Sequence, residues 1–546
     1  MKKKNNTATA WLMSGLFGVI TSLFLIFGYQ LETYDHIILS SNALILIVSF
    51  AVVVAFDSFY VWRNYESAEH GGKLFGIIKL PEIGQKYDTS RKDFLVNFEV
   101  LTVMALIVLL AEYPGFFVYD ALDELNEVLT RSFTTHHPLL HVLLMGGIVA
   151  AVHKLSGSWN IGIYVYIFIQ MLVICAIFAY VITYMQKSGI GKKGRIFWLI
   201  YYGAFPTIVM YTLCSCKDGL FSALLLLLTV FLIRLVSDTD GFLQDKRNVA
   251  LFVITATLMP MFRHNGFYAY LVFLPFALVF FRKKLKSILP VMLCLPVVLY
   301  LILSSALSAV CHTEGTDNQE MLTVPIMQLA RVYNYEKDSI SAEDKELIEE
   351  YIGVEGLSMY TPRVSDYVKI NFNNTLYGNN SRDFWAVWAR QFKAHPVAYL
   401  NAWFLTSYGY VYPPAIINVY KGNTVYTFTY DVSSYFGYEV EPPGERISLI
   451  PIIDRFYRYL SIGSFQQDAP VLHLFFSPGF YVIIFLYVFA YRLSRKRFKT
   501  VLPFMPMVLT FMTVLLGPTY LVRYVLYLWL IFPLIFITGD RAARFD

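Results

Sequence analysis

The chain has 546 residues, of which 57% are apolar, 17% are aromatic and only 15% are charged. Soluble domains carry about a quarter charged residues, so this composition excludes an ordinary soluble enzyme and indicates a protein solvated largely by lipid. The net charge of +5 is no nucleic-acid signature, because the positive residues gather in a few short loops.

Apolar runs of about 20 residues, the length needed to cross a bilayer, recur along the chain. The first covers 11–29 and follows the basic start MKKK without a small-residue cleavage site, so we expect a retained span instead of a signal peptide. Basic loops orient the runs, because Lys and Arg favour the cytoplasmic side. These loops lie at 1–4, 62–96, 186–195, 243–248, 282–286 and 492–499, and the tail at 541–546 is also basic.

The apolar run at 139–155 fits this charge pattern only if it does not cross. If it crossed, the loop at 186–195 and every basic loop after it would face outward. The run is also short and contains Gly146, Gly147, His141 and His153. We therefore predict an interfacial helix on the outer side, and a cytoplasmic position for both chain ends. The predicted spans are 11–29, 38–61, 96–111, 160–184, 196–213, 219–236, 248–262, 266–281, 289–310, 472–491, 500–517 and 521–538.

The expected fold class is mainly α: a polytopic membrane protein with about 12 transmembrane helices, an outer interfacial helix and an external, mostly helical domain. Ser341 and the acids after it predict a helix start in that external domain. The aromatic stretch 401–414 is expected at the membrane surface, where amphipathic rings settle. The expected domains are a two-span accessory module with its cytoplasmic loop at 1–95, a transmembrane core at 96–310 with a first external loop at 112–158, the external domain at 311–470 and the last spans at 471–546.

With this topology, the unusual polar residues converge on the outer face. The first external loop holds four acids within eight positions, from Asp120 to Glu127. Cations kept at outer helix ends oppose the sorting rule, and charged groups at membrane depth are costly and usually functional. The candidate binding residues are His136, His137, Lys217, Asp218, Arg263, His264, Asn265, Arg523 and Tyr524.

Among the four acids we favour Asp120 as functional, because it lies closest to the Pro-Gly turn at the membrane. Asp123, Glu124 and Glu127 fit the solvated face of a short amphipathic helix. The His136–His137 pair fits a helix-start turn as well as a site. Lys217 and Asp218 could pair with each other, and Arg263 or Arg523 could snorkel to the interface.

A cluster of this composition suits a lipid-linked anion. Cations would hold the phosphates near headgroup level and stabilise a departing phosphate, while a carboxylate acts as general base on a neighbouring hydroxyl. Neither the acids nor the five cysteines show a spacing that demands a metal, so no cofactor is required, although a divalent metal stays open.

These motifs resemble those of the GT-C superfamily, polytopic glycosyltransferases that use polyprenyl-phosphate-linked sugars. The stretches YPGFFVYD, HHPLLHVLLMGG, KDGLF, FRHNG and LVRYVLY carry the resemblance, which covers roughly 95–540. The whole arrangement is similar to an uncharacterised family of Gram-positive bacterial membrane proteins. The resemblance implies a catalytic base at Asp120. The adjacent acid pair usual in that superfamily falls here at Asp123-Glu124, which makes Asp123 the fallback.

The sequence thus predicts an inverting glycosyltransferase of the cell membrane. It would move a sugar from a polyprenyl-phosphate donor to a cell-surface glycan or glycolipid on the extracellular side. Retaining chemistry would need a second, nucleophilic carboxylate. The alternatives are a polysaccharide polymerase or ligase, a lipid-linked glycan transporter (flippase), and a non-catalytic scaffold or sensor.

Overall fold

The computed structural model describes residues 2–69, 72–79, 89–415 and 438–537 and is mainly helical, at 77%. Seven helices are long and apolar enough to cross a membrane. They are α1 (Lys2–Tyr34, apolar from Thr7), α2 (Ser41–Glu69), α3 (Arg91–Ala111), α5 (Leu139–Ser156), α6 (Trp159–Lys187), α9 (Asp218–Ser237) and α13 (Leu289–Cys311). The protein is therefore a helical membrane protein, as its composition predicted.

The twelve predicted spans match the helices only in part. Six of the seven long apolar helices coincide with predicted spans, and the seventh, α5, is the helix that charge sorting kept out of the membrane. The predicted span at 196–213 is broken, because Pro206 begins a new helix after the extended Phe205. The shorter membrane-core helices are α7 (Lys192–Ala204), α8 (Pro206–Thr212), α11 (Lys246–Phe262), α12 (His264–Phe280), α23 (Pro478–Ser494), α24 (Met505–Val514) and α25 (Tyr527–Ile531).

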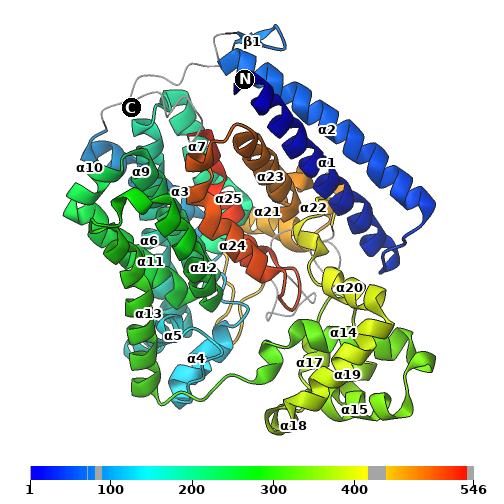
Figure 1. Ribbon diagram of the computed structural model, residues 1–546. Coiled ribbons are helices and arrows are strands. Elements are labelled where there is room, and N and C mark those ends of the chain that lie inside the picture. The colour runs from blue at the N-terminus through cyan, green and yellow to red at the C-terminus, as the bar shows by residue number, and fades with distance from the viewer. Residues whose placement is uncertain (1, 70–71, 80–88, 416–437, 538–546) are drawn as a thin grey trace.

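Two separate hydrophobic cores organise the chain. The larger core gathers α3, α6, α9, α11 and the last helices with the loops between them. The smaller one lies within α14 to α20, the green and yellow unit at the lower right of Figure 1. That unit contains α14 (Thr323–Tyr335), α15 (Ala342–Ile352), α16 (Val354–Ser358), α17 (Asp366–Lys369), α18 (Asn374–Asn379), α19 (Ser381–Ala394) and α20 (Pro396–Leu405). The predicted helix start at Ser341 is confirmed, because its side chain accepts the Asp344 N–H.

Residues 406–415, which follow α20, leave the small unit and enter the large core. Tyr408, Tyr410 and Tyr412 are buried there, the first two beside Tyr520, and the short turn at Tyr408–Tyr410 packs on α1 and α23. The aromatic stretch 401–414 is thus largely enclosed by protein. Residues 438–470, with α21 (Pro451–Ile462) and α22 (Phe465–Asp468), also belong to the large core.

The α1–α2 hairpin is attached to the small unit through polar contacts. Arg363 donates to the carbonyls of Leu31 and Glu32 and to the Asp35 carboxylate. Arg331 donates to the Asp35 carbonyl at 2.7 Å. The two spans predicted as an accessory module therefore also brace the unit formed by α14 to α20.

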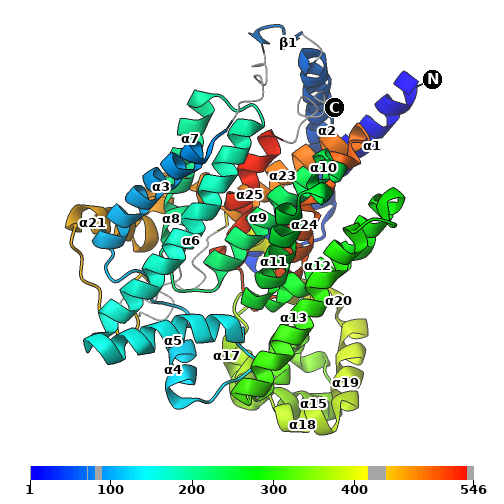
Figure 2. The ribbon, with the colours of Figure 1, turned by 90° about the vertical axis from the view of Figure 1, so that its left-hand side faces the viewer.

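The remaining elements are short. β1 (Lys73–Leu74) and β2 (Ile78–Lys79) form a small antiparallel ribbon in the loop after α2. This ribbon and the unit of α14 to α20 lie at opposite ends of the molecule in both views (Figures 1 and 2). The basic tail at 541–546 and part of the basic loop at 62–96 lie outside the described residues. The short helices are α4 (Ala121–Thr130) and α10 (Thr239–Gln244), with 3-10 turns at Arg282–Lys284, Asn318–Glu320, Lys337–Ser339, Tyr408–Tyr410, Leu472–Phe476, Phe498–Thr500, Leu502–Phe504, Val522–Val525 and Phe532–Phe536.

Candidate functional site

The Pro-Gly turn after α3 directs the loop that follows it toward the start of α9. Gly115 has a positive φ of 112°, and a Cβ there would meet the Ile167 side chain and the Leu213 carbonyl. The chain then pairs with the segment before α9: Phe116 donates to the Leu213 carbonyl and Ser215 donates to the Phe116 carbonyl, each at 2.9 Å. Because this pairing is parallel, it brings the residues that follow on both segments together.

The pairing places Asp120 against Lys217, and a third segment adds Arg523. The Asp120 carboxylate accepts from Lys217 Nζ at 2.7 Å and from Arg523 Nη1 at 3.2 Å. Burial would raise the pKa of Asp120, but the charges of Arg523 and Lys217 outweigh it and hold that pKa well below its usual range. Asp120 is therefore a carboxylate at neutral pH, and a weak base while both cations hold it.

Lys217 is shared among three acceptors. Besides Asp120, its ammonium donates to His137 Nδ1 at 2.9 Å and to Glu124 at 3.3 Å. Burial and the nearby ammonium lower the pKa of His137 to about 3, so its ring is neutral and can accept this bond. The lysine thereby ties the loop at 136–138 to the start of α4.

Glu124 extends the network into the core of the protein. It forms an ion pair and a short hydrogen bond with His141, the first-turn histidine of α5. Tyr166 of α6 contacts the other ring nitrogen of His141 at 2.9 Å and donates to Gln170 at 3.0 Å. Despite burial, the charges of His141 and Lys217 lower the pKa of Glu124 to about 2.

On the other side of Asp120, Arg523 leads to a second acid–base pair. Asp218 forms an ion pair with Arg263 and lies 3.9 Å from Arg523. The Arg523 guanidinium lies over the ring of Tyr119 at 4.3 Å, and Arg263 lies over the ring of Tyr524 at 4.6 Å. Tyr119 has a left-handed φ of 68°, which is uncommon for a bulky residue and marks a constrained turn directly before Asp120.

The structure thus joins most of the predicted binding residues in one network at the ends of several helices. Asp120, His137, Lys217, Asp218, Arg263, Arg523 and Tyr524 are its members that the sequence singled out. Three others lie apart. His136 is exposed and touches the network only through its ring contact with His137. His264 contacts Tyr300 of α13, and Asn265 donates to Thr513 of α24.

One interpretation of the acids needs adjustment. Glu124 was predicted to lie on a solvated face, and this was wrong: its side chain is 2% exposed, because it faces His141 and Lys217. Asp123, the fallback base, lies exposed on α4. Glu112, the residue after α3, is buried and paired with Arg446 at 3.1 Å.

Sequence reasoning missed His141, Tyr166 and Glu441 as neighbours of the site. His141 carried a signal, since a histidine inside an apolar run needs a partner. Glu441 is 319 residues away from Leu122, whose N–H it accepts at 3.0 Å, so no local pattern could show that contact.

Three side chains of the network are also possible ligands of a metal ion. Ligand atoms of Asp120, Glu124 and His137 all lie within 4.8 Å of one another, and two carboxylates with an imidazole suit Zn²⁺ or Mn²⁺. The ammonium of Lys217, however, bonds to all three side chains and takes the place that a cation would need. A metal would therefore have to displace Lys217.

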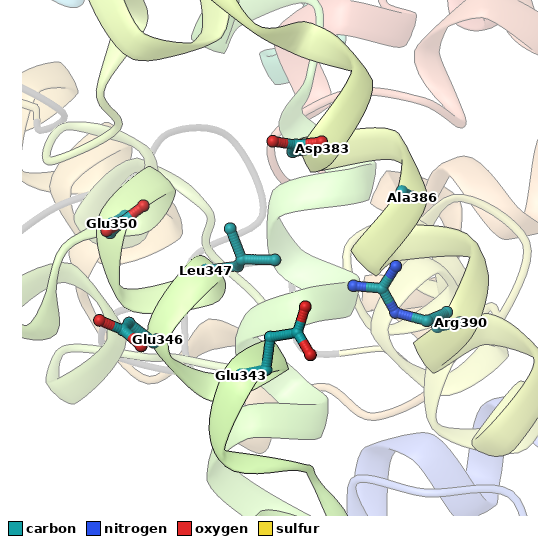
Figure 3. A pocket seen from close by; sticks show the side chains of 7 residues that line it. All are labelled: Glu343, Glu346, Leu347, Glu350, Asp383, Ala386 and Arg390. Carbon is teal, nitrogen blue, oxygen red and sulfur yellow. The ribbon is translucent and has the colours of Figure 1, made fainter.

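A surface cavity of about 260 Å³ lies elsewhere, in the unit of α14 to α20, and holds none of the predicted residues (Figure 3). Its single cation, Arg390, is already bound to Asp344. The lining residues are Glu343, Glu346, Leu347, Glu350, Asp383, Ala386 and Arg390.

Comparison with known proteins gives one match. Residues 127–545 match the family described as "Family of unknown function (DUF6020)". The chain belongs to this family. The matched residues include Lys217, Arg263 and Arg523 and begin seven positions after Asp120. No curated protein and no solved structure matches the chain.

Proposed function

We propose that this family member is an inverting glycosyltransferase of the GT-C type, which takes its sugar from a polyprenyl-phosphate donor. The observation that supports this best is the position of Asp120, a carboxylate held between Lys217 and Arg523 beside the Asp218–Arg263 pair. A carboxylate that can accept a proton and cations that can hold a phosphate are the two requirements of the transfer.

The proposed step balances as follows. The acceptor hydroxyl gives its proton to Asp120, and its oxygen bonds to the anomeric carbon of the sugar. The bond from that carbon to the phosphate oxygen breaks, and its electron pair leaves with polyprenyl phosphate. Arg523, Arg263 and Lys217 stabilise the charge that grows on the leaving phosphate.

Because of the ion pairs of Asp120, the donor phosphate has to bind before Asp120 can act as a base. While Lys217 and Arg523 both hold the carboxylate, its pKa stays low and its basicity is weak. A donor phosphate offers new acceptors to the same two cations. As they turn toward the phosphate, Asp120 regains basicity where the acceptor hydroxyl arrives.

The proposed topology has twelve spans, both chain ends in the cytoplasm and the site on the extracellular side. We propose that α5 lies along the outer membrane surface, although it is long and apolar enough to cross. In Figure 2, α5 runs across the direction of α6 and α9 instead of along it. A cysteine at Lys154 should react with an impermeant maleimide added outside intact cells. Labelling that requires permeabilised cells would contradict this placement.

Sugar transfer can be tested with the purified chain in liposomes that contain undecaprenyl-phosphate monosaccharides, with cell-wall polysaccharide as acceptor. Release of undecaprenyl phosphate would be measured by mass spectrometry. The variant Asp120→Asn should slow release by roughly 10²-fold or more, while Asp123→Asn, one turn away and exposed, should not. Unchanged release by Asp120→Asn, or no release from any donor, would refute the proposal.

The role of the cations is tested separately by donor binding. Charge-assisted hydrogen bonds contribute about 1.5–3 kcal/mol, so Arg263→Gln should weaken binding of undecaprenyl phosphate by about tenfold or more. Arg282→Gln, at the opposite end of α12, serves as the matched control. Equal affinities of the two variants would remove Arg263 from the phosphate site.

A further inference from the structure

Glu441 is a buried acid that approaches the site from a distant part of the chain. Its side chain is 1% exposed, and it lies where residues 438–449 run along the first external loop. The Glu441 N–H donates to the Phe117 carbonyl at 2.8 Å, and its carboxyl oxygen Oε2 accepts the Leu122 N–H at 3.0 Å. The other oxygen, Oε1, is buried and has no hydrogen-bond partner among the described residues.

In most helices, the N–H at the position of Leu122 is capped by the side chain of the N-cap residue. Asp120 is the N-cap residue of α4, and an Asp at that position usually accepts the N–H of the second or third helical residue. The Asp120 side chain makes no such bond here. It faces Lys217 and Arg523 instead, and Glu441 accepts the N–H that Asp120 leaves.

We propose that Glu441 is a positioning residue that caps α4 in place of Asp120, and so keeps the Asp120 carboxylate turned toward Lys217 and Arg523. The consequence for turnover rests on the proposed function of Asp120. Without Glu441, the Leu122 N–H loses its acceptor, and Asp120, as the N-cap residue of α4, is the side chain placed in the sequence to replace it. The carboxylate would then turn into the ordinary capping position and away from the two cations.

The charge of Glu441 agrees with this role. Burial, with the negative charges of Asp120 and Asp123, raises the pKa of Glu441 to about 9 against the effect of the Leu122 N–H. The titratable groups that act on it are these two acids of α4 and Cys214 before α9. Glu441 is therefore neutral at pH 7, and a glutamine can replace it as an acceptor without a change of charge.

The segment that carries Glu441 is held independently of it. Arg446 is paired with the buried Glu112, and its ring-facing guanidinium lies over Phe116 at 4.6 Å. Ile447 also donates to the Tyr113 carbonyl at 2.8 Å. Removal of the Glu441 side chain should therefore leave residues 438–449 in place, so the folded variant can be measured.

Turnover gives the first test, with Glu441→Gln, Glu441→Ala and, as a control, Glu445→Ala on the exposed side of the same turn. Glu441→Ala should lose on the order of 10²-fold in kcat, the cost of a displaced catalytic group. Glu441→Gln should restore most of it, because the glutamine amide oxygen can still accept the Leu122 N–H. Equal rates for Glu441→Ala and Glu445→Ala would overturn the proposal.

Hydrogen exchange of the Leu122 amide tests the cap without any sugar transfer, and so stands even if the proposed function fails. Asp120→Ala should leave this amide protected, because Glu441 caps it. Glu441→Ala combined with Asp120→Ala should exchange about fivefold faster, the loss expected for a missing N-cap. Fast exchange in Asp120→Ala alone would show that Asp120 is the cap and would refute the role of Glu441.

Discussion

Replacement of Lys217 by alanine should convert the lysine-centred cluster into a divalent metal site. The ammonium bonds to Asp120 at 2.7 Å, to His137 at 2.9 Å and to Glu124 at 3.3 Å. These three side chains are at most 20% exposed, so the lost charge is poorly replaced by water. Removal of one partner from a buried ion pair costs about 3–5 kcal/mol, and we expect a loss of stability of that size.

The vacated position is surrounded by suitable donors. Ligand atoms from all three side chains lie within 4.8 Å of one another, which allows one ion to reach them. An ion that binds only the folded chain stabilises it by RT ln(1 + [L]/Kd), about 2.7 kcal/mol at a hundredfold excess over Kd. Zn²⁺ or Mn²⁺ should therefore recover half or more of the stability that Lys217→Ala loses.

Thermal unfolding of the purified protein in detergent, titrated with Zn²⁺ and Mn²⁺, measures this recovery. Wild type should show no comparable rise in Tm, because Lys217 holds the position. The double variant Lys217→Ala with Glu124→Gln should lose the metal response. The same response in wild type and in Lys217→Ala, or none in either, would refute the view that the ammonium stands where a cation would bind.

Three further perturbations test the surrounding structure. Burial raises the pKa of Glu112 from 4.5 to about 7 against the effect of Arg446, so its stabilising contribution is full below pH 4.5 and lost as pH rises to 7. In a pH series of unfolding, wild type should therefore lose up to about 3 kcal/mol relative to Glu112→Gln over that range, and parallel curves would contradict it. Arg363→Ala should make the α14–α20 unit more sensitive to limited proteolysis, because its contacts with the α1–α2 hairpin are lost; an unchanged digestion rate would count against the brace. Tyr166→Phe removes the hydrogen bonds to His141 and Gln170 and should cost about 2 kcal/mol in the same unfolding assay; a neutral effect would contradict a stabilising role of these bonds.

The sequence predicted the components of the network better than its connections. Lys217, Arg263 and Arg523 were singled out because charge at a membrane surface is costly, and Asp120 because it lies closest to the Pro-Gly turn; neither argument needs knowledge of the fold. Their pairing was not predictable, because it depends on the parallel contact of Phe116 with Cys214. The burial of Glu124 was missed for the same reason.

The helices also differ in how well the sequence predicted them. Apolar length predicted α1, α2, α3, α6, α9 and α13, since a run of about 20 apolar residues has few alternatives in a bilayer. The run at 196–213 failed as one helix because Pro206 cannot continue the hydrogen-bond ladder, although its surroundings are apolar. The burial of the aromatic stretch 401–414 was not predicted, because tyrosines suit both a membrane interface and a buried contact with another tyrosine.

The balance of charge in the network limits what it can bind. A simple anion site would hold cations that no acid pairs with, whereas Lys217, Arg523 and Arg263 are each already paired with an acid here. An incoming phosphate must therefore take Lys217 or Arg523 away from Asp120, and the negative charge left on Asp120 is relieved only if that carboxylate gains a proton. A phosphate alone gives the displaced cation a new acceptor but leaves the charge on Asp120. A phosphate ligand that arrives together with a hydroxyl also supplies a proton to Asp120. The network therefore agrees better with the proposed group transfer than with simple phosphate binding. The alternating acids and bases are Glu124, Lys217, Asp120, Arg523, Asp218 and Arg263.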